Sequence, residues 1–256
     1  MTVTCERNGP VATITLNRPD KKNALNLPMR EQLPKLFQQV QDDVTIRAIV
    51  LAGAGGDFCA GADVREMGGG GIADSMARVE VLHRMVRGLV RTDIPVIAAV
   101  RGVCVGVGWS MALACDYVVA APDARFQFAF RHIGLAPDGG AVHLLSQNLG
   151  AIRAKALVYS GRFVSGQEAY DLGLVSELAV SQEPLERAQH VASELAQSPT
   201  LSLKMIKRQF AAAETQTFEE ALAGEMIMQP LLIRSDDFRE GATAFREKRN
   251  AHFTGQ

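Results

Sequence analysis

Three short segments of this chain are apolar at nearly every position, and they alternate with segments of helical pattern. The segments are RAIVLAG (47–53), PVIAAV (95–100) and YVVAA (117–121), and none alternates between polar and apolar residues. Strands that are apolar on both faces are typical of a parallel sheet, because helices cover both of its sides. The sequence therefore predicts an α/β fold, in which VATITL (11–16) adds a strand of alternating pattern.

Apolar residues that recur every three or four positions predict helices over residues 28–43 and 75–92. Pro34 is expected to bend the first helix or to delay its start, because proline lacks an N–H and clashes with the preceding turn. In the second helix, one apolar face is expected to consist of Met76, Val79, Leu82, Val86 and Leu89.

From about residue 150 the remaining segments all have a helical pattern. We place a boundary near the SPT segment at 198–200, between a core formed by residues 1–198 and a C-terminal helical region formed by residues 199–256. No internal repeat or low-complexity linker interrupts the chain.

The composition restricts the classes of function. The chain has 256 residues, 47% of them hydrophobic, and a formal net charge of −1. That charge gives no bulk attraction for nucleic acid or an anionic membrane. No secretory signal and no stretch of 18 apolar residues is present. The four cysteines form no CxxC pair and are interpreted as reduced, mostly buried side chains of a cytoplasmic protein. The five scattered histidines suggest no metal site.

Two glycine-rich loops follow predicted strands, FCAGAD (58–63) and GVCVGVG (102–108). Small residues allow the backbone to approach a ligand closely, and the second loop runs directly into a predicted helix. Two such loops side by side can offer two N–H groups to one oxygen, which is an oxyanion hole. The alternative is that these glycines only mark turns between strands and helices. Neither loop has the GxGxxG pattern of a dinucleotide site.

Six segments together resemble the enoyl-CoA hydratase/isomerase (crotonase) superfamily, in order and over nearly the whole chain. They are NRPDKKNALN, FCAGADVREM, IPVIAAVRGVCVGVGWSMALACDYVVAA, ARFQFAFRHIGLAPDGG, SGQEAYDLGLV and DFREGATAFREKR. The resemblance implies a spiral of ββα units followed by C-terminal trimerisation helices, in a homotrimer or homohexamer. It also implies an acyl-CoA thioester substrate and no cofactor beyond the CoA that the substrate carries.

The resemblance further implies that the N–H groups of Ala62 and Val107 hold the thioester oxygen. Family members usually have glycine where Val107 stands, so Val107 must adopt an ordinary negative φ if it donates. Asp63 has a second interpretation as the cap of a helix that begins at Val64. Lys22 is equally consistent with a solvated turn lysine. Phe245 and Lys248 are equally consistent with an ordinary amphipathic helix. The residues that the resemblance implies for CoA binding are Lys22, Ala24, Ala60, Asp63, Phe245 and Lys248.

The reaction is suggested by three positions. Hydratases of this family use two glutamates, and the corresponding residues here are Ser110 and Phe130. Asp138 in APDGG matches an acid that family isomerases use, and the segment looks most like ring-1,2-epoxyphenylacetyl-CoA and 3-enoyl-CoA isomerases. One carboxylate can take a proton from one carbon and return it to another, and apolar neighbours would raise its pKa by desolvation. The neighbours expected to do so are Phe130, Ile133, Leu135 and Ala136. Alternatively, Asp138 only shapes a turn or caps a helix that begins at Gly139 or Gly140.

Other functions remain open at this level. A hydratase in which Ser110 places the water is the first alternative to the isomerase. A dehalogenase is disfavoured because Arg87 and Phe130 stand where the resemblance requires histidine and tryptophan. A hydrolase would need Ser110, Asp116 and His143 as a triad, and a protein without catalysis would only bind partners. We interpret His132 and His143 as structural or surface residues, Trp109 as a core residue, and Met67 with the following glycines as a loop beside the acyl group.

Overall fold

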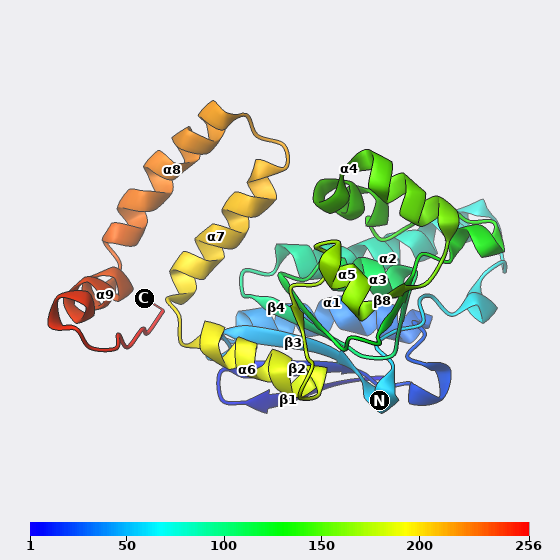
Figure 1. Cartoon of the computed structure of the whole chain (residues 1–256), viewed down its shortest axis with the longest axis horizontal. Coiled ribbons are helices and arrows are strands. Elements are labelled where there is room, and N and C mark those ends of the chain that lie inside the picture. Colours follow the sequence, from blue (N-terminus) through cyan, green and yellow to red (C-terminus); the bar gives the residue numbers. More distant parts are fainter. Residues whose placement is uncertain (256) are drawn as a thin grey trace.

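The computed structural model describes residues 1–255, and Figure 1 shows how its elements are arranged. All neighbouring strands of the main sheet are parallel except the first pair, β1 and β2. The mainly parallel α/β sheet is therefore confirmed. The edge strand β1 was not predicted, because it is largely polar. In spatial order the strands are β1 (Val3–Asn8), β2 (Val11–Leu16), β3 (Ala48–Gly53), β4 (Val96–Val100), β6 (Tyr117–Ala120) and β9 (Glu177–Leu178).

A second, smaller sheet contains β5 (Val103–Val105), β7 (Arg125–Gln127) and β8 (Val164–Ser165). Along the chain, a strand of the main sheet is followed by a strand of this small sheet and then by a helix, as in β4–β5–α3 and β6–β7–α4. This order agrees with the ββα units that the family resemblance implies. Strands of two or three residues are too short to produce a periodic pattern in the sequence.

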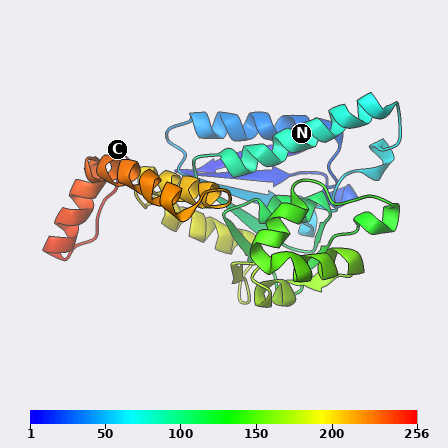
Figure 2. The same ribbon diagram turned by 90° about the horizontal axis from the view of Figure 1, so that it is seen from above.

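Helices cover both faces of the main sheet, as Figure 2 shows. In β3, Ile49 and Leu51 belong to the core shared with α1 and α2, whereas Ala48 and Val50 belong to the core shared with α6. This alternation explains why the strand is apolar throughout. The helices are α1 (Leu27–Asp42), α2 (Ile72–Arg91), α3 (Val107–Leu113), α4 (Ala141–Ser160), α5 (Gly166–Asp171), α6 (Pro184–Ala196), α7 (Thr200–Ala213), α8 (Phe218–Ile233) and α9 (Asp236–Glu247).

The expected delay of α1 at Pro34 is wrong, and the apolar face expected on α2 is buried only in part. Pro34 does not delay α1, which begins at Leu27 under the Asn26 cap and continues past the proline. In α2, Met76 is 68% exposed, and Val79 is also exposed. Only the C-terminal half of α2 is buried, whereas its N-terminal half borders a surface hollow.

The C-terminal helices α7, α8 and α9 project from the sheet as an arm (Figure 1). The helical pattern breaks between the end of α6 at Ala196 and the start of α7 at Thr200. A domain boundary near 198–200 stays a prediction, and the last residue of the predicted region, Gln256, lies outside the described residues. Arg47 ties the arm to the core by donating to the carbonyl groups of Ser198 (2.8 Å) and Phe253 (3.0 Å).

The cysteines are unpaired: Cys59 and Cys104 are buried, whereas Cys5 and Cys115 are partly exposed. Within residues 1–255, no helix has both the length and the apolar character needed to cross a bilayer. The same residues contain no cluster of histidine, cysteine, aspartate and glutamate suited to a metal ion.

Candidate active site

The two glycine-rich loops lie side by side in the structure. The Cys59 N–H donates to the Val103 carbonyl (2.9 Å), and the Val105 N–H donates to the Cys59 carbonyl (2.9 Å). The loops approach so closely at Gly61 that a Cβ there would stand 2.9 Å from the Val105 oxygen. Glycine is therefore required at Gly61, both for this approach and for its φ of +95°.

The Ala62 N–H points away from Leu25, the residue to which both neighbours of Ala62 are hydrogen-bonded. On either side of Ala62, the Gly61 carbonyl accepts from Leu25 N–H (2.8 Å) and the Asp63 N–H donates to Leu25 (3.0 Å). Because successive backbone groups of an extended segment point to opposite sides, the Ala62 N–H faces the other way. Within residues 1–255 it has no hydrogen-bond partner.

Val107 is the first residue of α3, and its N–H belongs to the first turn, which has no partner within the helix. The only non-glycine residues with positive φ among residues 1–255 are Lys22, Asn23 and Lys248. Val107 therefore has the ordinary backbone conformation that its side chain requires. The preceding Gly106 takes the positive φ of this turn, at +57°.

Helix α3 packs directly on the first loop. A Cβ at Gly108 would lie 2.6 Å from the Cys59 carbonyl oxygen and 2.8 Å from the Cys59 Cβ. Trp109, the next residue of α3, stacks on Phe128 at 4.4 Å between ring centroids, and it is buried as predicted. This packing fixes the separation of the Ala62 and Val107 donors.

Asp138 lies just before α4, and its carboxylate does not cap that helix. The cap residue is Gly140, and no side chain caps α4. The interpretation of Asp138 as a helix cap is therefore wrong. Its backbone carbonyl accepts from Ser110 Oγ (3.1 Å), whereas carboxylate atom Oδ1 is buried and has no hydrogen-bond partner in the described chain.

Burial raises the pKa of Asp138 above the ordinary value, and the charges of Arg30 and His83 partly oppose this. The direction agrees with the sequence-based expectation, but the predicted cause needs correction. Ile133 and Leu135 are 55% and 45% exposed, so they contribute little to the desolvation. The Asp138 segment instead packs on α3: a Cβ at Gly139 would lie 3.0 Å from Ser110 Cβ.

The positions of the two missing glutamates also border the site. Ser110 is fully buried, and its hydroxyl donates to the Asp138 carbonyl. Phe130 is buried with its ring edge beside Gly106, 3.7 Å from where a Cβ would stand, and it stacks on Phe128. The site therefore has the hydrogen-bonded hydroxyl of Ser110 and the aromatic ring of Phe130 where two-glutamate hydratases have carboxylates.

The structure does not assemble the hydrolase triad. Asp116 accepts from Lys207 Nζ (2.6 Å) and from the Val96 N–H (2.8 Å). His143 pairs instead with Glu214 (2.9 Å) on the surface. His132 lies 3.0 Å from the Gly161 carbonyl, as expected of a structural residue.

Three of the residues implied for CoA binding lie beside the first loop. The Ala60 N–H donates to the Lys22 carbonyl (2.9 Å), and Ala24 precedes the Leu25 bridge to Ala62. The Lys22 ammonium group is exposed, 4.0 Å from Asp57. The structure thus brings Lys22, Ala24 and Ala60 together at one edge of the candidate oxyanion hole.

Asp63 is a structural residue in this arrangement. It is buried, forms ion pairs with Arg18 (3.2 Å) and Arg65 (3.0 Å), and accepts from the Arg65 N–H. The hydrogen bonds from Arg65, with those from Arg18, hold the pKa of Asp63 at about 2. The prediction that it caps a helix beginning at Val64 is confirmed for a single 3₁₀ turn, Val64–Glu66.

Phe245 and Lys248 lie apart from the other candidate residues. Phe245 is an exposed residue of α9, and Lys248 caps that helix in the left-handed conformation. Figures 1 and 2 show α9 at the end of the molecule opposite α2. A single chain therefore does not bring them to the loops.

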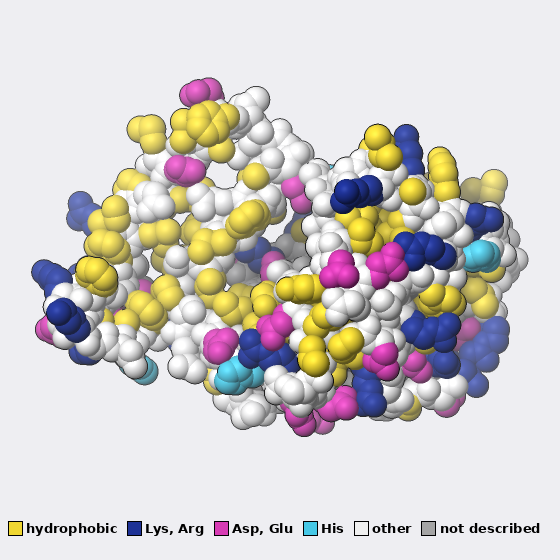
Figure 3. Space-filling model, viewed as in Figure 1, with side chains coloured by type: hydrophobic (Ala, Val, Ile, Leu, Met, Phe, Trp, Pro, Cys, Tyr) yellow, Lys and Arg dark blue, Asp and Glu magenta, His cyan; other side chains and the backbone are white. Residues whose placement is uncertain are grey.

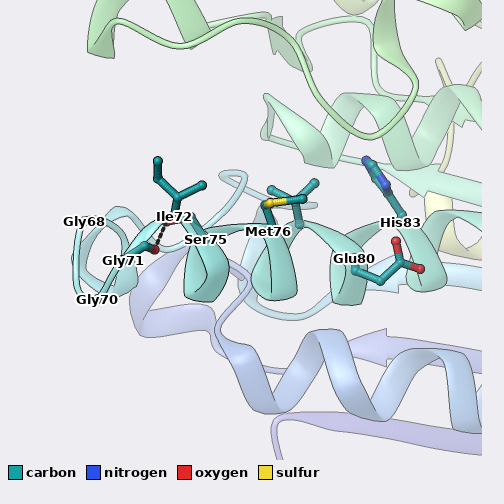
Figure 4. A pocket seen from close by; sticks show the side chains of 9 residues that line it. Gly68, Gly70, Gly71, Ile72, Ser75, Met76, Glu80 and His83 are labelled. Carbon is teal, nitrogen blue, oxygen red and sulfur yellow. Dashed lines mark hydrogen bonds between the residues drawn. The ribbon is translucent and has the colours of Figure 1, made fainter.

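Two basic side chains that act on the pKa of Asp138, Arg30 on α1 and His83 on α2, were not predicted from the sequence. His83 borders a hollow of about 650 Å³ that Gly68, Gly70 and Gly71 also line. Figure 4 shows this hollow from close by. The 72/76/79/83 spacing on α2 was the available signal, because it places His83 on the same face as Met76 and Val79.

Comparison with known proteins shows the same family over the same length. Residues 6–256 match the enoyl-CoA hydratase/isomerase family. The 1,2-epoxyphenylacetyl-CoA isomerase of Escherichia coli is 40% identical over 250 residues, which cover 96% of this chain and 95% of that protein. The 2,3-dehydroadipyl-CoA hydratase of the same organism is 33% identical, covering 98% and 97%.

The crystal structure of a putative enoyl-CoA hydratase from Streptomyces coelicolor superposes with a TM-score of 0.96 at 35% identity, covering all of this chain and 95% of the other. The fold is thus that of the crotonase superfamily. The chain belongs to the enoyl-CoA hydratase/isomerase family.

Proposed function

We propose that this protein moves a carbon–carbon double bond in an enoyl thioester of CoA, with Asp138 as the base. The observation that carries the proposal is the buried Asp138 Oδ1, which no protein group satisfies. A buried polar atom without a partner costs free energy, so such an atom packed against the helix that begins at Val107 points to use in binding or catalysis.

The Ala62 and Val107 N–H groups hold the thioester oxygen in this mechanism. Both donors are unpaired within the described chain. As the oxygen gains negative charge, its hydrogen bonds strengthen, and each such donor is worth about 10²–10³ in rate. The donors thereby lower the free-energy cost of forming an enolate from the bound ester.

Asp138 takes a proton from carbon 2 of a 3-enoyl ester. The electrons of that C–H bond form a dienolate whose charge lies on the thioester oxygen. A proton is then added at carbon 4, the carbonyl re-forms, and the double bond lies between carbons 2 and 3. The raised pKa of Asp138 suits this task, because a carboxylate that binds protons more tightly is a stronger base.

Hydration of a 2-enoyl ester is the alternative activity within the family. In that mechanism Ser110 would place the water, but its hydroxyl already donates to the Asp138 carbonyl, and the side chain is fully buried. The bulk of Phe130 occupies the second carboxylate position. These contacts favour isomerisation over hydration. A fold that binds without catalysis would not need the unpaired carboxylate.

The CoA part of the substrate would lie along Lys22, Ala24 and Ala60, at the edge that the two loops form. As proposed, the reaction uses no cofactor other than the CoA of its own substrate. We also infer that the chain works as a homotrimer or homohexamer, since its C-terminal arm exposes large apolar side chains on α8.

The test is a pair of assays with a 3-enoyl-CoA and a 2-enoyl-CoA of equal chain length. We expect conjugation of the first ester and no hydration of the second. Asp138→Asn should lower the isomerisation rate by about 10²–10⁴-fold while CoA-ester binding persists. A near-normal rate in that variant would remove Asp138 from the mechanism, and water addition by the wild-type protein would favour the hydratase.

A further inference from the structure

One stripe of side chains on α2 forms a wall of the hollow that Gly68, Gly70 and Gly71 also line. Ile72, Met76, Val79 and His83 are spaced by four, three and four residues, which places them on one face of the helix. Figure 4 shows Ile72, Met76 and His83 directed to the same side, away from α2 and into the hollow. The wall is thus apolar over its first turns and ends in an imidazole.

Helix α2 packs against α3, and the Asp138 segment is hydrogen-bonded to α3 through Ser110. Arg30 and His83 are the basic side chains that lower the pKa of Asp138, against the effect of its burial. Arg30 is already bound, because its guanidinium donates twice to the Leu25 carbonyl (3.0 and 3.2 Å). His83, in contrast, makes no side-chain hydrogen bond within the described part of the chain.

The other titratable side chain of the hollow is not free to exchange protons. Glu80 forms an ion pair with Arg87 (2.9 Å), and that partner lowers the pKa of Glu80. Glu80 therefore stays a carboxylate and cannot supply a proton. His83 is left as the unengaged acid–base group on the α2 side of the hollow.

We propose that His83 is a second proton-transfer group of this site, which donates to the acyl carbon that lies against α2 while Asp138 takes the proton beside the thioester. This inference rests on the proposed isomerisation and adds a catalytic residue to it. The apolar residues Ile72, Met76 and Val79 then contact the part of the acyl group beyond the reacting carbons.

Every proton and electron pair of this mechanism is accounted for. Asp138 removes one proton from carbon 2, and the C–H electron pair enters the dienolate. The His83 imidazolium adds one proton at carbon 4, and the thioester carbonyl re-forms. The site then holds a protonated Asp138 and a neutral His83. Transfer of one proton from the acid to the imidazole through solvent restores the starting state.

The source of the carbon 4 proton distinguishes this mechanism from a shuttle by Asp138 alone. An imidazolium exchanges its protons with solvent, so in D₂O the product should carry one deuterium at carbon 4 per early turnover. A single carboxylate that carries the substrate's own proton would leave hydrogen there. In His83→Gln we expect isomerisation to fall about 10²-fold or more, with the residual product retaining hydrogen at carbon 4.

A second measurement separates this inference from the proposed function. Exchange of the carbon 2 protons of hexanoyl-CoA into D₂O needs only the base and the oxyanion donors. His83→Gln should exchange at the wild-type rate, and Asp138→Asn should not exchange. His190→Gln is the matched control, since His190 pairs with Glu194 on α6 (3.1 Å), and it should change neither reaction.

The other outcomes overturn the inference in distinguishable ways. An unchanged isomerisation rate and label in His83→Gln would exclude His83 alone and leave the proposed function standing. Loss of both reactions in that variant would mean a structural role. Carbon 2 exchange without isomerisation in the wild-type protein would contradict the proposed function itself, and with it the role of His83.

Discussion

Asp138 combines two properties that a purely structural aspartate avoids. Its Oδ1 is buried without a partner, and the helix that follows is capped without it. Leaving such a group unsatisfied costs about 1–3 kcal/mol. The free energy is recovered only if a ligand or a proton occupies the carboxylate, which is what a general base requires.

The fall of kcat/KM at low pH should reflect the raised pKa of Asp138. Burial raises its pKa, while Arg30 from α1 and His83 from α2 act in the opposite direction. The active form is the carboxylate, so activity is lost as pH falls through the pKa of the folded protein. We expect kcat/KM for a 3-enoyl-CoA to fall at a pH above about 3.9, the ordinary value for aspartate.

The measurement is kcat/KM between pH 4 and 8, with the fold checked at each pH by circular dichroism. Asp138→Glu is an informative comparison, because it keeps a carboxylate and should keep an acid limb. A profile that stays level down to pH 4 in the folded wild-type protein would mean that no group with a raised pKa acts as the base.

At the level of single residues, the sequence could indicate those groups that belong to short motifs. Ala62, Val107, Ser110 and Asp138 each stand at a definite place in a glycine-containing segment. Arg30 and His83 were missed, because their helices come from other parts of the chain and meet the Asp138 segment only in the folded protein. The ion pairs of Asp63 with Arg18 and Arg65 likewise form only in the folded protein.

Among the elements, the contact between α3 and the first loop determines the geometry of the oxyanion donors. Gly108 has no room for a side chain, since a Cβ would meet the Cys59 oxygen at 2.6 Å. Because that neighbour is backbone, it can move only if the loop moves. Gly88 on α2 is different, because the nearest atom to its Cβ would be Phe37 Cδ2 at 3.5 Å, an ordinary contact.

We therefore expect Gly108→Ala and Gly88→Ala to have opposite effects. Gly108→Ala should lower isomerisation by at least about tenfold, the loss that 1.4 kcal/mol of transition-state stabilisation produces, and should lower the free energy of unfolding. Gly88→Ala should retain activity and gain about 0.5–1 kcal/mol of stability from the helix propensity of alanine. Urea denaturation and initial rates measure both, and equal effects of the two substitutions would contradict this account of α3 packing.

The elements that could be predicted are those with a long and uniform pattern. The strands β3, β4 and β6 are buried on both faces, and the longer helices after residue 150 have enough turns to show their period. The strand β1 is an exposed edge with little apolar pattern, and β5, β7, β8 and β9 have three residues or fewer. Helix α2 shows a further limit: periodicity places Met76 and Val79 on an apolar face but cannot distinguish a core from an open hollow.

On the scale of the whole molecule, the arm formed by α7, α8 and α9 leaves many large apolar side chains exposed. Figure 3 shows hydrophobic side chains spread along it. On α8 the exposed ones include Phe218, Leu222, Met226, Ile227 and Leu231. Apolar surface of this extent is typical of an interface, because a monomer would leave it in water. The trimer or hexamer that the family resemblance implies offers a second copy of the chain to cover it.

A charge placed on the exposed face of α8 tests whether the chain associates with itself through this helix. Met226 is 79% exposed on α8 and Val44 is 92% exposed in the turn after α1, so both substitutions to glutamate should leave the folded chain intact. If α8 is an interface, Met226→Glu places a charge in it and should shift the sedimenting species toward the mass of one chain, whereas Val44→Glu should sediment as the wild type. Analytical ultracentrifugation at several concentrations measures this, with circular dichroism as a check of the fold. A wild-type protein that sediments as one chain at every concentration would show that the exposed face of α8 is not used for self-association.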